Sequence, residues 1–409
     1  MVDKNQFQFI FLVTLLSSIS LFSTDIFLPA LPQMAEFFQC SHAQIQMSFS
    51  ISLIGIAACH LLTGLLADRF GRKKVLLFGM ILFTTASILC ALAQTIQQFV
   101  LFRLLQAIGG GSGSVISRTL IVDRYDRKEA VKIFSTIFPI ASIGGAIAPF
   151  IGGYMTYFWT WQVTFIFIAI VGVGILTSVI ILENKEALSP SSTPIEPLSS
   201  QLAGKKHLEV VTNLEFIAHV CIIAACFSAF RSYIVESPFV FTAQGFDVQE
   251  IGRFYMLPSV SYIIGNLLAK RLIQNQMPNQ LLRTGMILFV FGAACLLVVT
   301  YIFPFSPYAL IIAMSMLIFG NGLLFPTASA GAMTAVPKKH AGIASGFLGA
   351  SGFIASALAI SWVGDFCQGD AQKLAFFIAV PVVFGLISYL TLASHSRHCE
   401  TTAGCHILK

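Results

Sequence analysis

Long apolar runs constrain this chain more than any other feature of its sequence. Runs of about 20 apolar residues recur along all 409 residues, and at 1.5 Å per residue a helix of that length crosses a hydrocarbon core of about 30 Å. Hydrophobic residues make up 56% of the chain and charged residues only 10%, whereas a soluble domain is about 25% charged. We therefore predict an all-α integral membrane protein with twelve transmembrane helices.

The first apolar run differs from a secretory signal peptide. It is longer than the apolar core of such a peptide, and it ends in FLPALP rather than in a small-residue cleavage site. We expect it to remain as the first helix. The twelve predicted spans are 7–28, 44–67, 75–93, 99–120, 131–156, 163–182, 214–235, 248–269, 282–302, 308–333, 341–363 and 374–392.

A polar linker divides these spans into two sets of six. Residues 183–212, which include ENKEALSPSSTPIEPLSS, are rich in Ser, Pro and charge, as expected of an exposed linker. They separate an N-terminal half, residues 1–182, from a C-terminal half, residues 213–394. Residues 395–409 are expected to form a cytoplasmic tail.

The two halves repeat one another in sequence. GLLADR at 64–69 corresponds to GNLLAKR at 265–271, and GMILF at 79–83 recurs unchanged at 285–289. A duplicated six-helix unit with a polar central loop is typical of secondary transporters, in which a site near the mid-membrane is exposed alternately to the two sides. We therefore expect a pseudo-symmetric pair of halves.

The distribution of basic residues predicts the topology. If the N-terminus is cytoplasmic, nineteen of the 24 Lys and Arg residues lie in cytoplasmic segments, and the opposite loops hold only Arg253 and Lys373. This bias places both termini in the cytoplasm. The net charge of +6 then reflects topology, and no nucleic-acid partner is expected because the basic residues are divided among short segments.

No motif for enzymatic or metal chemistry stands out. The chain has no ATP-binding loop of the G-x-x-x-x-G-K-[ST] type, and no aqueous loop gathers a nucleophile, a base and an orienting group. We predict that the protein is not an enzyme and that it needs no cofactor. The tail lacks ordered zinc-ligand spacing, so no metal site is predicted there; its candidate ligands are His395, His398, Cys399, Cys405 and His406.

Charged residues within the spans are the candidates for function, because an ionisable group in hydrocarbon is costly and usually serves a pathway or a proton relay. Asp25 lies about three residues from the outer end of its span, and Arg103 about four residues from the outer start of its span. Their similar depth would allow them to pair, and we assign proton coupling to both. A purely structural ion pair and a water-facing carboxylate at a helix end remain the alternatives.

A second charged pair lies in FRSYIVESPFV, residues 230–240. Arg231 and Glu236 could bind a charged substrate, or Glu236 could be a second titrating carboxylate. Residues five apart do not align on a regular helix, so direct pairing would need a distortion ahead of Pro238. The predicted substrate-binding residues are Phe27, Arg231, Tyr233, Glu236, Phe239 and Phe325.

Several motifs together resemble the major facilitator superfamily, and within it the drug:proton antiporters of the bicyclomycin-resistance type. They are GLLADRFGRKK at 64–74, FRLLQAIGGGSG at 102–113, GGAIAPFIGG at 144–153, STDIFLPALP at 23–32 and SPFVF at 237–241. The resemblance covers essentially the whole chain. The Trp-Arg pair often found at the start of the sixth helix reads Trp161-Gln162 here, which departs from the family pattern.

The resemblance implies roles for two of these motifs. The first would be a conformational latch, in which Asp68 meets the start of the eleventh helix near Ala341 and Arg72 reaches Asp123; alternatively its cations only anchor the topology. The latch residues are Gly64, Asp68, Arg69, Gly71, Arg72 and Asp123. The antiporter motif of the fifth helix comprises Gly144, Gly145, Pro149, Gly152 and Gly153, which we expect to act in packing and bending.

The sequence thus predicts a transporter driven by the proton gradient. We expect a multidrug efflux antiporter of the inner membrane that exports drugs or small amphipathic metabolites by alternating access. Its expected partners are a small-molecule substrate, protons and the lipid bilayer, and we expect a monomer. The alternatives are a facilitator or proton symporter that imports a small nutrient, and a membrane scaffold that transports nothing.

Overall fold

The computed structural model describes residues 4–125, 127–183, 212–273, 278–303, 306–337 and 341–407. Every regular element in these ranges is helical. The N-terminal half contains α1 (Lys4–Asp25), η1 (Leu28–Ala30), α2 (Leu31–Phe37), α3 (His42–Phe70), α4 (Arg72–Leu92), α5 (Ile96–Arg124), α6 (Arg127–Phe158) and α7 (Trp161–Glu183). The C-terminal half contains α10 (Leu214–Ala243), α11 (Val248–Phe254), α12 (Met256–Leu272), α13 (Pro278–Ile302), α14 (Pro307–Thr334), α15 (Ala341–Phe366) and α16 (Ala371–Ile407).

Each predicted span corresponds to a helix or to consecutive helices, so the predicted all-α membrane fold is confirmed. Within the described residues, nine helical stretches are long and apolar enough to cross a membrane. Three ends lie more than four residues beyond the predicted spans. The first span continues through η1 and α2 to Phe37 instead of ending at 28. Helix α10 continues through Pro238 to Ala243, eight residues beyond the predicted end, and α16 continues from the predicted end at 392 to Ile407.

Side-chain caps define where helices begin at one end of the bundle. Ser41 and Gln44 form a reciprocal capping box at the start of α3, with donor–acceptor distances of 2.9 and 3.3 Å. Asp247 and Glu250 form another at the start of α11. At the opposite end, Gly71 separates α3 from α4 with φ = +89°, a backbone conformation that residues other than glycine rarely adopt.

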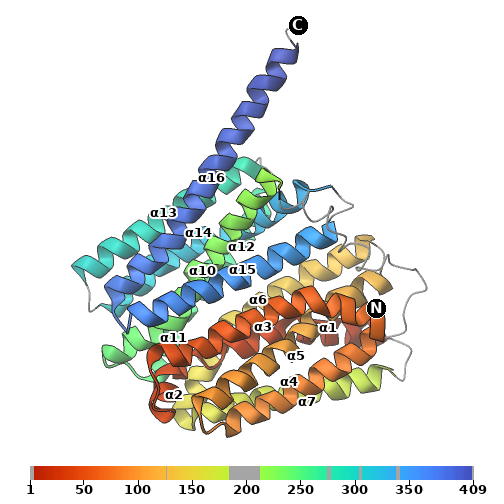
Figure 1. The fold of residues 1–409 in the computed structure, drawn as a ribbon, viewed down its shortest axis with the longest axis vertical. Helices are drawn as coiled ribbons and strands as arrows, with labels where there is room; N and C mark the ends of the chain where they lie inside the picture. The colour runs from red at the N-terminus through yellow and green to blue at the C-terminus, as the bar shows by residue number, and fades with distance from the viewer. Residues whose placement is uncertain are drawn as a thin grey trace.

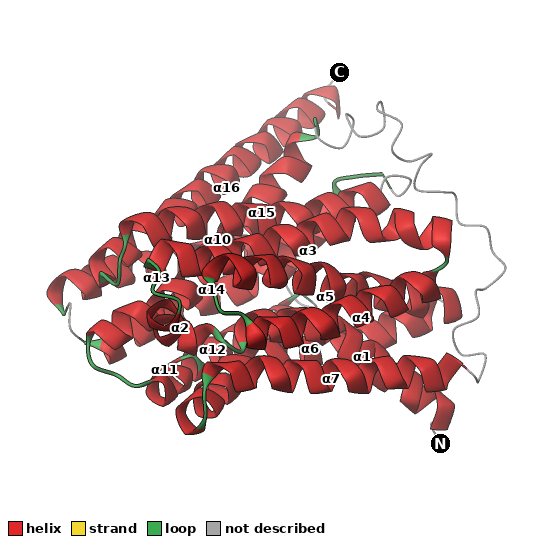
Figure 2. Cartoon of the chain, turned by 60° about the horizontal axis from the view of Figure 1, so that its bottom comes forward, coloured by secondary structure: helices red, strands yellow, loops and turns green. Residues whose placement is uncertain are grey.

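The two halves lie side by side as separate helix groups. Figure 1 shows α1–α7 below and α10–α16 above, with α3 of one half next to α15 of the other. In Figure 2 the halves approach one another near α2 and α11 and spread toward the end where α1 begins and α16 ends. We name these the α2–α11 end and the terminal end. The interfaces between the halves are chiefly α3 with α15 and α6 with α11.

Candidate functional site

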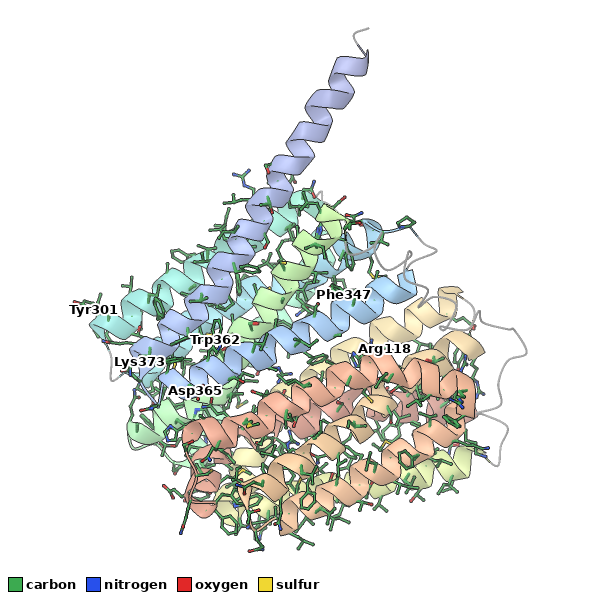
Figure 3. The ribbon with its side chains drawn as sticks, in the orientation of Figure 1. Arg118, Tyr301, Phe347, Trp362, Asp365 and Lys373 are labelled. Atoms are coloured by element: carbon green, nitrogen blue, oxygen red, sulfur yellow. The ribbon has the colours of Figure 1, made fainter. Side chains whose placement is uncertain are left out.

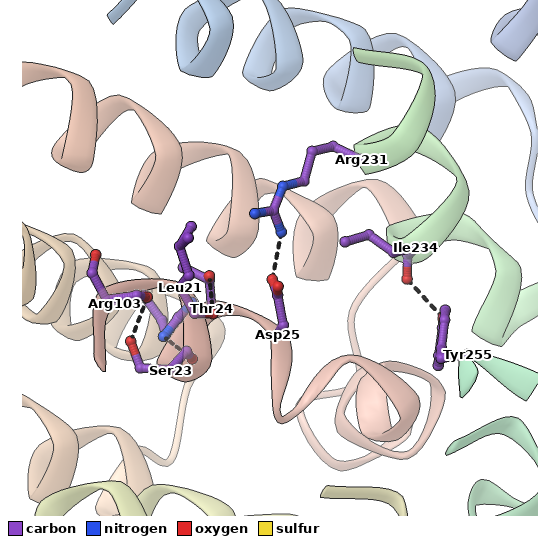
Figure 4. A network of polar contacts seen from close by, with 9 residues as sticks. Leu21, Ser23, Thr24, Asp25, Arg103, Arg231, Ile234 and Tyr255 are labelled. Carbon is purple, nitrogen blue, oxygen red and sulfur yellow. Dashed lines mark hydrogen bonds and ion pairs between the residues drawn. The ribbon is translucent and has the colours of Figure 1, made fainter. Parts of the chain in front are cut away.

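A buried ion pair joins the two halves near the α2–α11 end. Asp25 is the last residue of α1, where Pro29 in the following η1 prevents the helix from continuing unchanged. Its Oδ1 accepts a hydrogen bond from Nη1 of Arg231 on α10 (Figure 4). Both residues are buried, at 6% and 4% exposure. Because one charge comes from each half, this contact can exist only while the halves are together at this depth.

The environment of Arg231 is largely aromatic. The guanidinium carbon lies 5.6 Å from the centre of the Phe49 ring and 5.8 Å from that of Phe230. Its Nε is buried without a hydrogen-bond partner. Such faces attract a cation but replace little of its lost hydration. Asp25 is therefore the principal anionic partner that keeps this charge at the interface.

Arg103 lies nearby but is not the partner of Asp25. Its Nη1 donates to the Ser23 carbonyl at 3.3 Å and to Gln106, and its guanidinium lies 4.5 Å from the centre of the Phe27 ring. Figure 4 shows Arg103 beside the turn of α1 that precedes Asp25. The predicted Asp25–Arg103 ion pair is thus wrong for this conformation, because Arg231 occupies the carboxylate from the other half.

Neutral groups hold Arg103 in place. Gln106 accepts from Arg103 and donates through Nε2 to Ser87 Oγ at 2.7 Å. Arg103 is only 1% exposed, and its Nε and Nη2 have no hydrogen-bond partner. Two donor nitrogens of this buried cation, with three N–H groups between them, are therefore unpartnered in this conformation.

Glu236 makes a second contact between the halves. Its carboxylate accepts from the side-chain amide of Gln46 on α3 and from the backbone N–H of Gly369 at 2.7 Å. The residue is completely buried. Gly369 lies between α15 and α16 with φ = +82°, so this turn favours glycine. Glu236 thereby links α10 to α3 of the other half and to the α15–α16 turn, and it does not pair with Arg231.

The remaining predicted substrate residues lie in packed surroundings. The buried Phe27 ring packs against Phe49, Phe99 and Phe165, in the interior of the N-terminal half. In this conformation Phe27 therefore does not line an open cavity, contrary to the prediction. Three others lie in the C-terminal half: Tyr233, buried with an unpartnered hydroxyl; Phe239, whose ring centre is 4.1 Å from that of His42; and Phe325, half-buried against Phe227.

The small residues of α6 allow close approach to Asp25 and to the other half. A Cβ built on Gly145 would lie 3.7 Å from Oδ2 of Asp25. One on Gly152 would lie 1.5 Å from the Ile26 carbonyl oxygen, and one on Gly153 2.8 Å from the Val248 carbonyl oxygen of α11. The motif therefore packs α6 against both α1 and the C-terminal half, while Pro149 is buried in the same helix.

Replacing Gly152 with alanine is expected to destabilise the protein by about 1–3 kcal/mol, because the added methyl must push α6 away from the Ile26 backbone, just after α1. The measurement is the thermal unfolding midpoint of the purified protein. Gly144→Ala is the matched control on the same helix, since a Cβ there meets nothing within 4 Å. Equal melting temperatures for the two variants would contradict this packing role.

The predicted latch falls largely on side chains outside the described residues. This holds for Gly64, Asp68 and Asp123, and also for Ala341, the expected partner position. Within the described part, Arg69 is exposed beside the Phe70 ring at 5.3 Å. Gly71 forms the turn between α3 and α4, and Arg72 is half-buried at the start of α4. The latch stays a prediction.

Metal and thiol chemistry find little support in the described part of the chain. It contains no group of three or more His, Cys, Asp or Glu residues placed to hold a metal ion. The side chains of the tail from 395 onward lie outside it. Cys40 and Cys367, near the α2–α11 end, are free cysteines. Burial, with the negative charges of Glu236 and Asp370, raises the pKa of the Cys367 thiol to about 12, so it is protonated and poorly nucleophilic at neutral pH.

Three buried polar residues beside the charged groups were not predicted from the sequence. Gln46 donates to Glu236, Gln106 accepts from Arg103, and the Tyr255 hydroxyl donates to the Ile234 carbonyl at 2.8 Å (Figure 4). Their signal was a polar side chain within an apolar run, which also marks ordinary helix-packing residues. The Asp25–Arg231 pairing had a stronger signal, because both residues lie three to four positions from the outer ends of their predicted spans.

The chain is similar to known transporters along most of its length. The Major Facilitator Superfamily model matches residues 13–360. The bicyclomycin resistance protein homolog of Haemophilus influenzae is 24% identical over 396 residues, covering 96% of this chain and 98% of that protein. The multidrug resistance protein MdtL of Klebsiella pneumoniae is 27% identical over 372 residues, covering 90% of each chain.

The same fold occurs in a solved structure. The xylose transporter XylE from E. coli, in an inward open conformation, superposes with a TM-score of 0.73 at 16% identity, over 94% of this chain and 95% of that one. The predicted resemblance to the superfamily and to its bicyclomycin-resistance members is thereby confirmed. The protein is a multi-pass membrane transporter and not an enzyme. Its helical architecture, its sequence relatives and the extent of the family match agree that the chain belongs to the Major Facilitator Superfamily.

Proposed function

We propose that this chain is a proton-coupled antiporter that exports drugs or small amphipathic metabolites by alternating access. The observation that carries this proposal is the buried Asp25–Arg231 pair, which joins the halves through a group that can hold or release a proton. The similarity to proteins named for bicyclomycin resistance and multidrug resistance supports export as the direction. The energy source is the proton gradient across a bacterial inner membrane.

The orientation follows from the distribution of Lys and Arg. With both termini in the cytoplasm, the α2–α11 end faces the periplasm. The contacts of Asp25 with Arg231 and of Glu236 with Gln46 then close the periplasmic side. In this conformation a compound reaches the protein from the cytoplasm.

The ion pair links proton movement to opening and closing. In the empty transporter, ionised Asp25 holds Arg231 and keeps the periplasmic side shut. A compound bound from the cytoplasm must supply the free energy that separates the two charges and opens that side. Once Arg231 has withdrawn, the Asp25 carboxylate lies in low-dielectric surroundings without a cation beside it. Because such surroundings disfavour the charged form, it takes a proton from the periplasm after the compound leaves.

Closing then delivers the proton to the cytoplasm. Neutral Asp25 no longer holds the transporter in one state, and the return of Arg231 to the carboxylate favours the ionised form. Arg103 stays in the same half as Asp25 and, by holding the Ser23 carbonyl, fixes the turn that carries the acid. Each proton that enters yields about 2.3 kcal/mol per 100 mV and about 1.4 kcal/mol per pH unit. One or two protons therefore suffice to move a compound uphill.

This function is tested with inside-out membrane vesicles that carry the protein and a fluorescent pH indicator. After the vesicles are acidified by respiration, a panel comprising ethidium, norfloxacin, chloramphenicol and bicyclomycin is added. We expect at least one compound to dissipate the proton gradient in vesicles with the protein and not in vesicles without it. If no compound does so, and sugars or amino acids added in a parallel panel enter right-side-out vesicles through the protein instead, the importer alternative holds.

A further inference from the structure

A cavity separate from the ion pair opens at the α2–α11 end. It is lined by residues of both halves and has a volume of about 430 Å³. This volume is within the range of about 300–1,000 Å³ for pockets that hold drug-sized ligands. We name it the vestibule. Its lining residues are Pro29, Pro32, Gln33, Glu36, Thr156, Tyr157, Trp159, Thr242, Phe246, Asp247 and Val248.

The lining combines negative charge with aromatic surface. Glu36 comes from α2 of the N-terminal half, and Asp247 caps α11 of the C-terminal half. Tyr157, Trp159 and Phe246 add three aromatic side chains to the same wall. Carboxylates and aromatic faces both attract cations, and aromatic faces also stack on planar ligands. Among the described residues, no lysine or arginine lines the vestibule.

One polar group in this wall has no partner. Thr156 is only 3% exposed and lines the vestibule, and its Oγ1 makes no hydrogen bond. The hydroxyls of other buried threonines, such as Thr164 and Thr300, bond to carbonyls of the preceding helical turn. A buried hydroxyl without a partner is costly unless a ligand or water completes it. Thr156 therefore offers an acceptor and a donor to a molecule in the vestibule.

The charge of this end also favours cations. Within the described residues it carries the carboxylates of Glu36, Asp247, Glu250, Asp365 and Asp370 and the cations Arg253 and Lys373. Figure 3 shows Asp365 and Lys373 at this end of the C-terminal half. Arg253 is held by the Tyr154 hydroxyl at 2.9 Å and lies outside the lining. A negative excess raises the local concentration of cations at a cleft.

We propose that the vestibule binds aromatic organic cations that carry a hydrogen-bonding amine. The carboxylates of Glu36 and Asp247 would flank the charge, the aromatic side chains would stack on the ring system, and Thr156 would bond to the amine. The vestibule lies closer to the α2–α11 end than the ion pair does. Pro29 comes after Asp25, and Thr242 comes after Arg231, on segments that run toward this end. A role as the last site that an exported cation occupies rests on the proposed function; the binding itself does not.

The test uses full-length purified protein in lipid nanodiscs, with ethidium as the probe. Gln33→Cys, in a background in which Cys40, Cys399 and Cys405 are replaced with serine, places a thiol in the wall, and its labelling rate by a water-soluble maleimide is measured with and without ethidium. We expect saturating ethidium to slow labelling about tenfold, as a bound ring system covers the thiol. A cysteine in place of Lys373, at the same end but outside the wall, should be labelled at an unchanged rate.

The charge requirement is tested with Glu36→Gln combined with Asp247→Asn. Asparagine still caps α11, so the local fold is kept. We expect the ethidium concentration for half-protection to rise about tenfold, because two carboxylates that face the cation are lost. Asp365→Asn, which removes a charge at the same end outside the wall, should leave that concentration unchanged, and the anionic dye 8-anilinonaphthalene-1-sulfonate should give no protection.

Three results would overturn the proposal. They are the absence of protection in the parent protein, equal protection in the doubly neutralised variant, and an equal loss of protection in Asp365→Asn. The vesicle assay is independent of these readouts. Protection in nanodiscs without compound-driven proton movement in vesicles would leave the vestibule site standing and remove the antiport function.

Discussion

Replacing Arg231 with glutamine is expected to open the α2–α11 end of the protein. The change leaves the buried carboxylate of Asp25 without its cation, and removing one partner of a buried ion pair costs about 3–5 kcal/mol. Since about 1.4 kcal/mol corresponds to a factor of ten, the population open at this end should rise about 100-fold or more. The readout is a cysteine in place of Ser237, which is fully buried on α10 six residues beyond Arg231. A membrane-impermeant maleimide should label it far faster in the Arg231→Gln background.

A matched control and a rescue make this prediction specific. Arg253 also connects the halves, through the Tyr154 hydroxyl, but it lies at the exposed rim, so Arg253→Gln should change labelling about twofold or less. Combining Asp25→Asn with Arg231→Gln removes both charges and should restore slow labelling, because no uncompensated charge remains. Wild-type labelling in the single variant, or fast labelling in this neutral pair, would contradict the closing role of the ion pair.

The neutral pair is also expected to lose proton-driven transport. At an imposed pH difference of about two units, one coupled proton sustains about a 100-fold gradient of the transported compound, since each unit is worth about 1.4 kcal/mol. In proteoliposomes the wild type should approach that gradient with a compound identified in the vesicle panel. The neutral pair should reach a ratio of about one, because neither amide at these positions exchanges a proton near neutral pH.

Exchange of labelled for unlabelled compound separates loss of coupling from loss of folding. The neutral pair should retain this exchange, because closing and opening no longer depend on the charges of Asp25 and Arg231. Asp25→Glu, which keeps an acid opposite Arg231, should keep uphill accumulation at a reduced rate. Uphill accumulation by the neutral pair at the wild-type level would remove Asp25 from the coupling step.

Much of the fold follows from the sequence because the bilayer allows few solutions. A spanning segment must satisfy its backbone internally, so each run of about 20 apolar residues forms a helix. The main departures are at polar boundaries. The seventh span was predicted to end at 235, yet α10 continues through Glu236, Ser237 and Pro238 to Ala243. Glu236 is buried there because Gln46 and Gly369 satisfy its carboxylate, partners that no local pattern reveals.

The site was predictable in composition but not in pairing. Rare intramembrane charges identified Asp25, Arg103, Arg231 and Glu236. Asp25 lies at a depth similar to that of Arg103, but also to that of Arg231. Depth alone does not show which helices of the two halves face one another. That choice depends on packing between segments far apart in the sequence, such as the close contact of Gly153 with the Val248 carbonyl of α11. The glycines of α6 were expected to serve packing, and the structure adds that Gly145 adjoins Asp25 itself.

The most direct test of the central claim, that Asp25 carries the proton exchanged for the exported compound, reverses the usual driving force. Proteoliposomes are loaded with the transported compound and a pH indicator, diluted into compound-free medium with no initial pH difference, and followed for proton movement as the compound leaves. We expect protons to move in the direction opposite to the compound in the wild type, and the neutral pair to release the compound with no proton movement. Equal proton movement in the two would contradict this claim.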